Sequence, residues 1–343
     1  MTSRRTFIRT GLLAGAGLLT PKVFRGASPA APVNKGLRVG IIGLDTSHSI
    51  AFAKSLNGDG ASEYGGYRVT AAYPHGSRDI ESSVKRIPEY TKEIAGLGVK
   101  ITSSIGELLK ETDVILLETN DGRLHLEQAL EVFRAGKTVF IDKPVAASLS
   151  DAMAVYRAAE DFSVPVFSAS SLRYMSGMDH LLKENAIGRI LGADTFSPCA
   201  LEPTHPDFFW YGIHGVEALY TVMGVGCRSV SRVHTADTDV VTGVWEDARI
   251  GTFRGIRGGA GGYGGYAFGE KGIEQLGTYS GYDPLLREIV RFFRTGRPPV
   301  PSQETLEIFT FMEAAHESGR RNGAAVELSE VRDRALNEVR KTW

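Results

Sequence analysis

The chain has 343 residues, of which 42% are hydrophobic and 23% are charged. This composition is typical of a globular protein with two domains, and it excludes a disordered or fibrous chain. The 39 Lys and Arg residues balance the 40 Asp and Glu residues, which leaves a formal net charge of -1. No overall basic field therefore favours a nucleic-acid partner.

The first 30 residues contain the parts of a twin-arginine export signal. Arg4-Arg5 precedes an apolar run over residues 11–19, and small residues at 28–30 offer a cleavage site. The alternatives are an amphipathic first helix or a membrane anchor, but the apolar run is about half of the roughly 20 residues that a span requires. We predict a signal over 1–30, a linker over 31–36, and a periplasmic or otherwise exported protein without a stable membrane span.

Short apolar strands alternate with helices up to about residue 165. The strands are predicted at 37–43, 67–73, 113–118 and 138–141, and the helices at 49–56, 81–95, 105–110 and 124–135. Strands that are apolar on both faces indicate a parallel sheet covered by helices on both sides. Residues 37–165 are therefore predicted to form a doubly wound, Rossmann-type α/β domain, whose ligands bind beyond the carboxyl ends of the strands.

The pattern of the second half differs, because strands there follow one another through turns. They are predicted at 190–198, 228–235, 238–246, 249–257 and 263–268, and helices at 175–185, 214–223, 284–295 and 303–321. This order predicts an α+β domain over 166–325 with a largely antiparallel, open sheet. Residues 326–343 are predicted to be a C-terminal tail.

The turn after the first strand is where a dinucleotide's pyrophosphate would lie. A dinucleotide motif has three glycines there, whereas this chain has Gly43-Leu44-Asp45-Thr46-Ser47-His48 and keeps only the first. A carboxylate at Asp45 would repel two phosphates by several kcal/mol at about 4 Å and an intermediate dielectric. Either the loop takes a detour, or a cation or sugar hydroxyls replace the phosphates; alternatively, Asp45 or Ser47 caps the helix.

Two other strand ends carry candidate side chains. Arg78 follows the second strand and suits a 2′-phosphate, although an ordinary solvated loop is the alternative. Asp142-Lys143-Pro144 follows the fourth strand, where a lysine braced by an acid and a proline can hold a substrate hydroxyl or move its proton. The alternative for Lys143 is a solvated strand end.

Histidine, aromatic and acidic residues gather over residues 204–217. His214 and Glu217 lie three apart at the start of a helix and hence on one face. With Trp210 and Tyr211 beside them, they would form a sugar-binding platform with His214 as general base. The alternative for His214 is a core histidine whose hydrogen bonds are satisfied.

The sequence alone does not decide whether the chain binds a metal ion or forms a disulfide. His48, His205, Asp207, His214 and Glu217 are all suitable ligand types, but their spacing matches no strong metal motif. The only two cysteines, at positions 199 and 227, form either one disulfide or two buried thiols. The glycine-rich run at 255–272 either cradles a ligand with its backbone or forms a hairpin tip.

Taken together, these segments resemble the glucose-fructose oxidoreductase, inositol dehydrogenase and rhizopine-catabolism (Gfo/Idh/MocA) family over nearly the whole chain after the signal. The family usually has Glu-Lys-Pro where this chain has Asp142-Lys143-Pro144. The other matching segments are Val39-Gly40-Ile41-Ile42-Gly43, Asn120 with His125, Ala135-Gly136-Lys137-Thr138-Val139, Arg173-Tyr174, Gly212-Ile213-His214 and Glu313-Ala314-Ala315-His316-Glu317-Ser318.

The resemblance implies a Rossmann domain that binds NAD or NADP, and a second domain whose open sheet makes a homo-oligomer. It also implies hydride transfer to or from a sugar or cyclitol carbon, with Lys143 and His214 as catalytic residues. The implied cofactor contacts are Gly43, Asp45, Thr46, Ser47, His48, Arg78, Asn120, His125 and Lys143. The implied substrate contacts are Arg173, Tyr174, Trp210, Tyr211 and Glu217.

The chain departs from the family at two places. Asp45 and His48 replace the second and third glycines of the dinucleotide motif, and Trp210 stands where many of these dehydrogenases have an aspartate. The leading hypothesis is an exported NAD(P)-dependent oxidoreductase acting on a small carbohydrate. One alternative is a lyase or glycoside-cleaving enzyme with a divalent metal held by His48, His214 and acids. The other is a sugar-binding protein without catalytic activity.

Overall fold

The computed structural model describes residues 38–342. The predicted export signal and linker lie outside the described residues. Among the helices within 38–342, none combines the length and apolar character that crossing a membrane requires.

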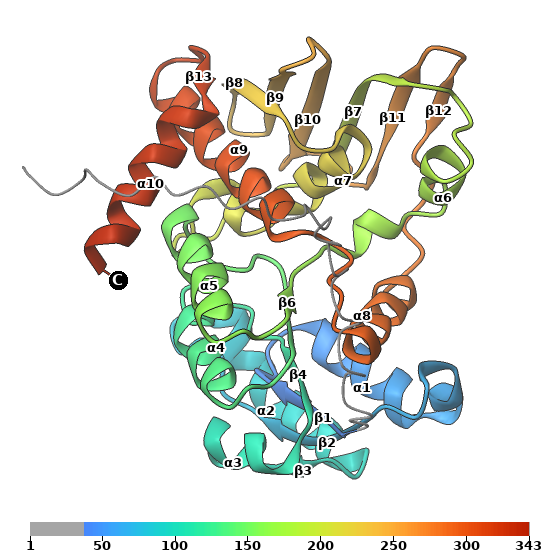
Figure 1. The fold of residues 1–343 in the computed structure, drawn as a ribbon, viewed down its shortest axis with the longest axis vertical. Coiled ribbons are helices and arrows are strands. Elements are labelled where there is room, and N and C mark those ends of the chain that lie inside the picture. The colour runs from blue at the N-terminus through green and yellow to red at the C-terminus, as the bar shows by residue number, and fades with distance from the viewer. Residues whose placement is uncertain (1–37, 343) are drawn as a thin grey trace, which may run out of the picture. The chain divides into compact units, whose positions relative to one another are not determined.

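The first sheet has six parallel strands, which confirms the predicted Rossmann-type architecture (Figure 1). In spatial order they are β3 (Lys100–Ile101), β2 (Arg68–Tyr73), β1 (Arg38–Ile42), β4 (Val114–Leu117), β5 (Val139–Ile141) and β6 (Val166–Phe167). The strands β3 and β6 were not predicted, since two residues carry no periodic pattern. All four residues of β4 are buried, as expected of a strand covered on both faces.

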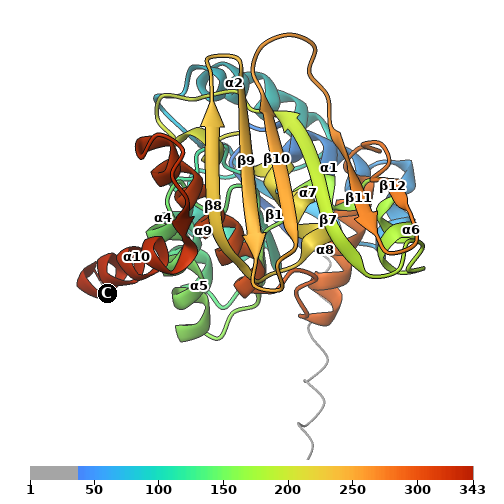
Figure 2. The same cartoon turned by 90° about the horizontal axis from the view of Figure 1, so that it is seen from above.

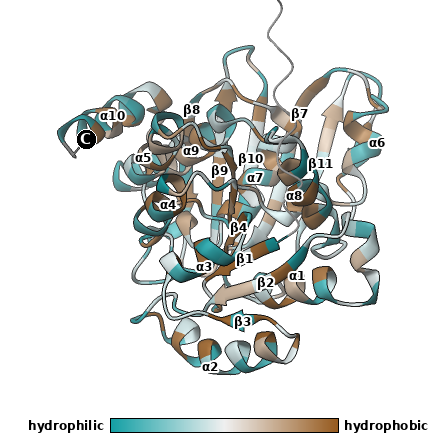
Figure 3. Ribbon diagram, turned by 60° about the horizontal axis from the view of Figure 1, so that its bottom comes forward, coloured by the Kyte–Doolittle hydropathy of each residue, from teal (hydrophilic) through white to brown (hydrophobic). Residues whose placement is uncertain are grey.

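Helices cover both faces of this sheet, and Figure 3 shows apolar strands between helices of mixed polarity. They are α1 (Ser47–Asn57), α2 (Glu81–Gly96), α3 (Ile105–Glu111), α4 (His125–Arg134) and α5 (Leu149–Asp161). The face beside α1 is also covered by α8 (Asp283–Thr295), which comes from the second half of the chain. Its buried residues pack in one core with Phe52 and Phe140. The segment that leads into α8 is thereby placed beside the crevice of the first domain (Figure 1).

The second sheet has seven strands and confirms the predicted α+β domain. In spatial order they are β12 (Ile273–Gln275), β11 (Gly264–Gly269), β7 (Ile190–Pro198), β10 (Ile250–Ile256), β9 (Thr238–Trp245), β8 (Cys227–His234) and β13 (Val326–Glu327). All neighbours are antiparallel except β7 and β10. The helices α7 (Ile213–Met223) and α9 (Ser302–Arg320) pack on one face, and Figure 2 shows the strands from the other side. The short α6 (Met178–Leu182) lies beyond β12.

The last residues of the chain differ from the predicted tail. They form β13, which pairs with β8, and α10 (Leu328–Thr342), which packs against α5 and α9. Val331, Ala335 and Val339 lie four residues apart on α10 and are buried, so this charged helix has one apolar edge.

The two cysteines, Cys199 and Cys227, are buried free thiols rather than a disulfide. Burial raises the pKa of each to about 12, so neither is a reactive thiolate at neutral pH.

Candidate active site

The turn between β1 and α1 requires glycine at its first position. Gly43 has φ = 87°, and a Cβ there would lie 2.5 Å from the backbone nitrogen of Thr119 in the next loop. Its N–H donates to the carbonyl of Tyr73 at 2.9 Å. Thr46 caps α1, since its Oγ1 accepts from the N–H of Ser49 at 3.4 Å. The role predicted for Gly43 as the turn residue agrees with this geometry.

Asp45 does not extend its carboxylate into the place expected for phosphates. The side chain is fully buried and accepts from the N–H groups of Ser77 at 3.2 Å and Asn120 at 2.9 Å. A Cβ at Gly76 would collide with it, so the carboxylate fills the space between three crevice loops. Burial raises the pKa of Asp45 to about 6, against the opposing effect of these hydrogen bonds. The carboxylate of Asp45 thus ties the loops together and does not line the cavity, so its predicted contact with a cofactor stays a prediction without support from this geometry.

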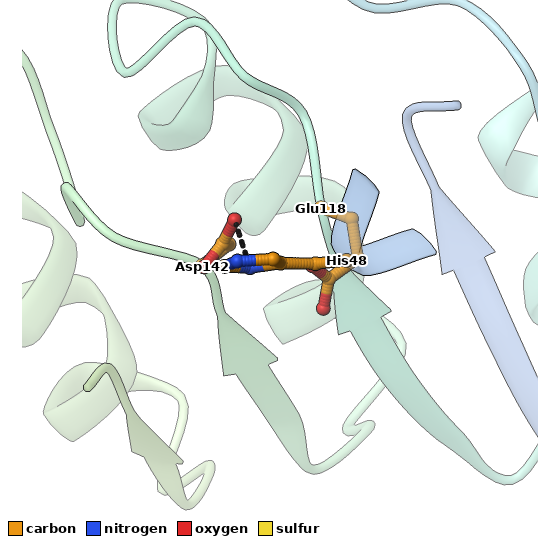
Figure 4. A group of neighbouring side chains, drawn as sticks. All are labelled: His48, Glu118 and Asp142. Atoms are coloured by element: carbon orange, nitrogen blue, oxygen red, sulfur yellow. Dashed lines mark ion pairs between the residues drawn. The ribbon is translucent and has the colours of Figure 1, made fainter. Parts of the chain in front are cut away.

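His48 lies at the third glycine position and turns its ring inward. Its Nδ1 lies 2.9 Å from Oδ2 of Asp142 and 3.9 Å from Oε2 of Glu118 (Figure 4). Glu118 follows β4 and Asp142 follows β5, so adjacent strand ends place both carboxylates beside the first turn of α1. Burial, and then the charge of Asp142, raise the pKa of Glu118 well above its usual value. Burial also disfavours ionised Asp142, but His48 and Lys143 outweigh it and lower its pKa to about 2.

Lys143 and His214, predicted from opposite halves of the chain, line one cavity. Lys143 is half-buried at the end of β5, and its N–H donates to Asp142 Oδ1 at 2.8 Å. His214 is buried in the first turn of α7, with Nδ1 2.7 Å from Ser170 Oγ. Ser170 Oγ also accepts from the N–H of Leu172, which fixes the position of the hydroxyl group. The second ring nitrogen of His214, Nε2, takes no part in this contact. Burial, followed by the positive charges of Lys143 and His48, lowers the pKa of His214 well below 6.5.

The cavity has a volume of about 200 Å³ and a wall of tyrosines. This is below the roughly 300–1,000 Å³ typical of small-molecule pockets, so it suits a ligand part of monosaccharide size. Tyr211 and Tyr263 join their hydroxyls at 2.8 Å, and Tyr282 OH lies 3.1 Å from Ser47 Oγ. Apolar ring faces beside polar groups are typical of carbohydrate sites. The complete lining is Thr46, Ser47, His48, Arg86, Asn120, Asp142, Lys143, Ser171, Leu172, Tyr211, His214, Tyr263, Tyr279 and Tyr282.

The polar end of the cavity fits the phosphates of a dinucleotide. Thr46 and Ser47, at the N-terminus of the eleven-residue α1, face the cavity together with the guanidinium of Arg86. Arg86 Nη1 donates to the carbonyl of Asp45 at 3.3 Å, which places this cation beside the turn. The Asp45 carboxylate is held by the N–H groups of Ser77 and Asn120 and does not line the cavity. Asn120, also predicted, lines the cavity and donates from Nδ2 to Ser83 Oγ at 3.4 Å.

Arg173 and Glu217, predicted as substrate contacts, do not line the cavity and pair with each other instead. Arg173 Nε lies 3.0 Å from Glu217 Oε1, and Arg173 Nη2 lies 2.6 Å from Glu304 Oε1. The Arg173 side chain is 11% exposed and that of Glu217 is 5% exposed. They form a buried ion-pair network between the segment at Ser171–Tyr174, α7 and α9.

Other predicted contacts also lie away from the cavity lining. His125 is buried between the carbonyls of Thr119, 2.6 Å from Nε2, and Val145, 3.3 Å from Nδ1. Its ring therefore joins the loops after β4 and β5. Other predicted contacts outside the lining are Gly43 in the turn before α1, Trp210, whose ring packs on His205 at 5.0 Å, the half-buried Tyr174, and Arg78 in the exposed loop after β2.

The metal-ligand types considered from the sequence do not gather at one point. His205 Nε2 accepts from the N–H of Gly122, and Asp207 pairs with Arg232 at 2.7 Å. The residues that join His48 are Glu118 and Asp142, which the chain separates from it by 70 and 94 positions. The sequence did contain one indication that Glu118 belongs to a site, since it is an ionisable residue at the end of a wholly apolar strand. Arg86, Tyr279 and Tyr282 had no such signal, because their place depends on how α2 and α8 pack.

Comparison with known proteins bears on the first domain. Residues 37–170 match the family model GFO_IDH_MocA, described as "Oxidoreductase family, NAD-binding Rossmann fold". A 1,5-anhydro-D-fructose reductase of Ensifer adhaerens is 33% identical over 128 residues, which cover 36% of this chain and 38% of the relative. An uncharacterized oxidoreductase of Streptococcus pneumoniae is 28% identical over 131 residues, covering 36% and 35%.

The chain thus matches little more than a third of the length of these curated relatives. A solved structure extends the comparison to the second domain, for the fold alone. The scyllo-inositol dehydrogenase of Lactobacillus casei, with bound NAD(H) and scyllo-inositol, superposes with a TM-score of 0.68 at 15% identity. The match covers 86% of this chain and 100% of that one, which shows a shared two-domain fold.

Proposed function

We propose that this chain is an NAD(P)-dependent oxidoreductase of the Gfo/Idh/MocA family, which transfers hydride to or from a hydroxyl-bearing carbon of a sugar or cyclitol. The observation that carries the proposal is the shared cavity. Lys143 from the first domain and His214 from the second line it together with the N-terminus of α1. The family match over 37–170, the fold shared with a scyllo-inositol dehydrogenase and the tyrosine wall support the proposal.

In the proposed mechanism, a bound nicotinamide dinucleotide supplies the hydride acceptor or donor. Thr46, Ser47, Arg86 and Asn120 would hold it at the polar end of the cavity. The protein's own part is proton and oxygen chemistry. Lys143 Nζ donates to the substrate oxygen, and His214 Nε2 takes the hydroxyl proton or returns it in the reverse direction. The low pKa of His214 keeps the ring neutral, as a base must be.

The cell compartment and the assembly belong to the same proposal. The twin-arginine motif supports export to the periplasm, and that route carries proteins that fold and take up their cofactor beforehand. Apolar side chains on the uncovered face of the second sheet support a homo-oligomer. NAD and NADP are the two candidate coenzymes, and the coenzyme titration described next distinguishes between them.

The test is coenzyme binding by the full chain, followed by oxidation of a panel of sugars and cyclitols. We expect one NADH or NADPH per chain by fluorescence titration, and substrate-dependent formation of reduced coenzyme. Lys143→Met and His214→Asn should each lower kcat by roughly 100-fold or more, with Lys85→Met on the exposed face of α2 as the matched control. A chain that binds neither coenzyme contradicts the proposal. Unchanged sugar binding in both variants without turnover in any form indicates a sugar-binding protein.

A further inference from the structure

The side chains of His48, Glu118 and Asp142 meet beside the cavity, which His48 and Asp142 line. One atom from each, a ring nitrogen and two carboxylate oxygens, lie within 4.8 Å of one another. Figure 4 shows that they come from the first turn of α1 and from the ends of β4 and β5. Three separate elements of the sheet crevice therefore bring them together, and neighbouring strands hold the two acids in fixed register.

These side chains have unpaired polar atoms in the protein interior. Glu118 is 0% exposed and Asp142 1% exposed. Neither oxygen of Glu118 has a hydrogen-bond partner among the described residues, while Asp142 Oδ2 and His48 Nδ1 have only each other at such a distance, 2.9 Å apart. Buried polar atoms are normally paired, because leaving one unpaired costs roughly 1–3 kcal/mol and more for a charge. This cluster is therefore built for a partner that the protein itself does not supply.

The other buried acids show how unusual Glu118 is. Within residues 38–342, each of the remaining acids classed as buried has a basic or N–H donor. Asp45 and Asp142 accept backbone N–H groups, Asp121 and Glu217 pair with arginines, and Asp239 pairs with two arginines. The only charged contact of Glu118 in this part of the chain is His48, at 3.9 Å. Two carboxylates that face one imidazole leave an excess of negative charge.

A divalent cation satisfies this arrangement in charge and in ligand type. It neutralises two carboxylates and accepts a lone pair from the imidazole, and mixed nitrogen and oxygen ligands suit Zn²⁺ and Mn²⁺. Ligands that share one ion at about 2.0–2.2 Å lie at most about 4.4 Å apart. The observed spread needs only a small rotation of a carboxylate. The hydrogen bond from the Lys143 N–H to Asp142 Oδ1 holds that ligand in place.

The remaining coordination positions would face the cavity. His48 and Asp142 both line it, next to Lys143. Three protein ligands with an open position are typical of metal sites that bind a substrate, whereas structural sites are closed by four. We propose that His48, Glu118 and Asp142 bind one Zn²⁺ or Mn²⁺ ion, whose open position takes an oxygen of the bound substrate. The site stands independently of coenzyme binding, so either proposal can fail alone.

The test uses the full chain after treatment with EDTA and dialysis. ZnCl₂ and MnCl₂ are titrated separately by calorimetry at pH 7.5, and elemental analysis counts the metal in the protein as purified. We expect one ion per chain, and roughly 100-fold weaker binding in Glu118→Gln and in Asp142→Asn. His316→Gln is the matched control, because His316 is also buried beside a carboxylate, Asp207 at 3.4 Å, and should bind the ion unchanged.

Thermal stability adds a readout that separates a metal site from a structural cluster. Without metal, Glu118→Gln replaces a buried carboxyl group that has no hydrogen-bond partner by a neutral amide, so its Tm should be no lower than that of the wild type. With saturating metal, the order should reverse. If the variants fail to fold, the metal titration of the wild-type chain and the rise of its Tm with metal still show whether the chain binds a metal ion. The proposal is overturned if the wild-type chain takes up no stoichiometric metal, or if the Glu118→Gln variant binds metal equally well. The side chains of the cluster would then share a proton instead of a metal ion.

Discussion

Under the proposed function, single side chains in the crevice carry the chemistry, and the pH dependence of their protonation makes it measurable. His214 is buried beside Lys143 and His48, and its pKa lies well below 6.5. A base with a lowered pKa stays neutral through the physiological range. We therefore expect kcat/KM for alcohol oxidation to stay level from pH 8 to below pH 6.5, and to fall only in more acidic buffer.

The matching substitutions complete this first prediction. His214→Asn should remove the acidic limb and lower kcat/KM by roughly 100-fold or more, whereas His180→Asn on the exposed side of α6 should leave the profile unchanged. A limb centred above pH 6.5, or one that survives His214→Asn, would assign the base to another group.

The second prediction concerns Asp45, whose folded-state pKa of about 6 exceeds the usual 3.8. An acid with a raised pKa favours the folded state when protonated, so the unfolded chain loses its proton first as pH rises. Stability should decrease between about pH 4 and pH 6, by about 3 kcal/mol in total. The Asp45→Asn side chain does not ionise, but its amide replaces one acceptor oxygen by a donor. The variant should therefore be less stable than the wild type at pH 4, and the difference in unfolding free energy should shift in its favour by about 3 kcal/mol between pH 4 and pH 8.

Urea unfolding at several pH values measures this difference, with Asp59→Asn on the surface as the control whose curve should parallel the wild type. If the unfolding free energy of Asp45→Asn depended on pH in the same way as that of the wild type, ionising Asp45 would cost the folded state no free energy, and the prediction would be wrong.

At the scale of elements, the third prediction tests whether Arg173 binds substrate or holds the fold. Its guanidinium bridges the segment at Ser171–Tyr174 to Glu217 of α7 and Glu304 of α9. Arg173→Met leaves two carboxylates unpaired, and breaking a buried pair typically costs about 3–5 kcal/mol. We expect a loss of that size in urea unfolding, partly recovered by adding Glu217→Gln. A variant of normal stability with a raised KM would restore the substrate role.

The elements also show which parts of the molecule can be predicted from sequence. The long strands and helices follow from hydrophobic periodicity, and the crevice follows from the rule on strand ends. Lys143 was singled out by the rule on strand ends, and His214 by the cluster of histidine, aromatic and acidic residues over 204–217; both line the cavity. Glu217 was misplaced because helical spacing gives the face of α7, but not that Arg173 would meet it there. Tyr282 was missed because its position depends on α8 packing against the first domain, a contact between segments more than 200 residues apart.

At the scale of the whole molecule, the open face of the second sheet is the feature without a partner. We use "open face" for the outward residues Val233, Val240, Val244, Ile250, Tyr266 and Ile273, which cross-strand register places on the same side. Val233 is 71% exposed, Ile250 52% and Ile273 64%. Large contiguous apolar patches on soluble proteins usually mark an interaction site.

The fourth prediction follows from this face. If two copies bury it against each other, light scattering after gel filtration should give a mass of two or more chains at micromolar concentration. Ile250→Glu places a charge at the centre of the patch, and an unpaired buried charge opposes association by several kcal/mol. This variant should therefore elute as a monomer with an unchanged circular dichroism spectrum. Leu182→Glu, on α6 and 41% exposed, tests the same change elsewhere and should leave the assembly intact. A monomeric wild type would contradict the prediction. An Ile250→Glu variant that still assembles would place the subunit contact on another surface, because a charge is costly to bury without a partner.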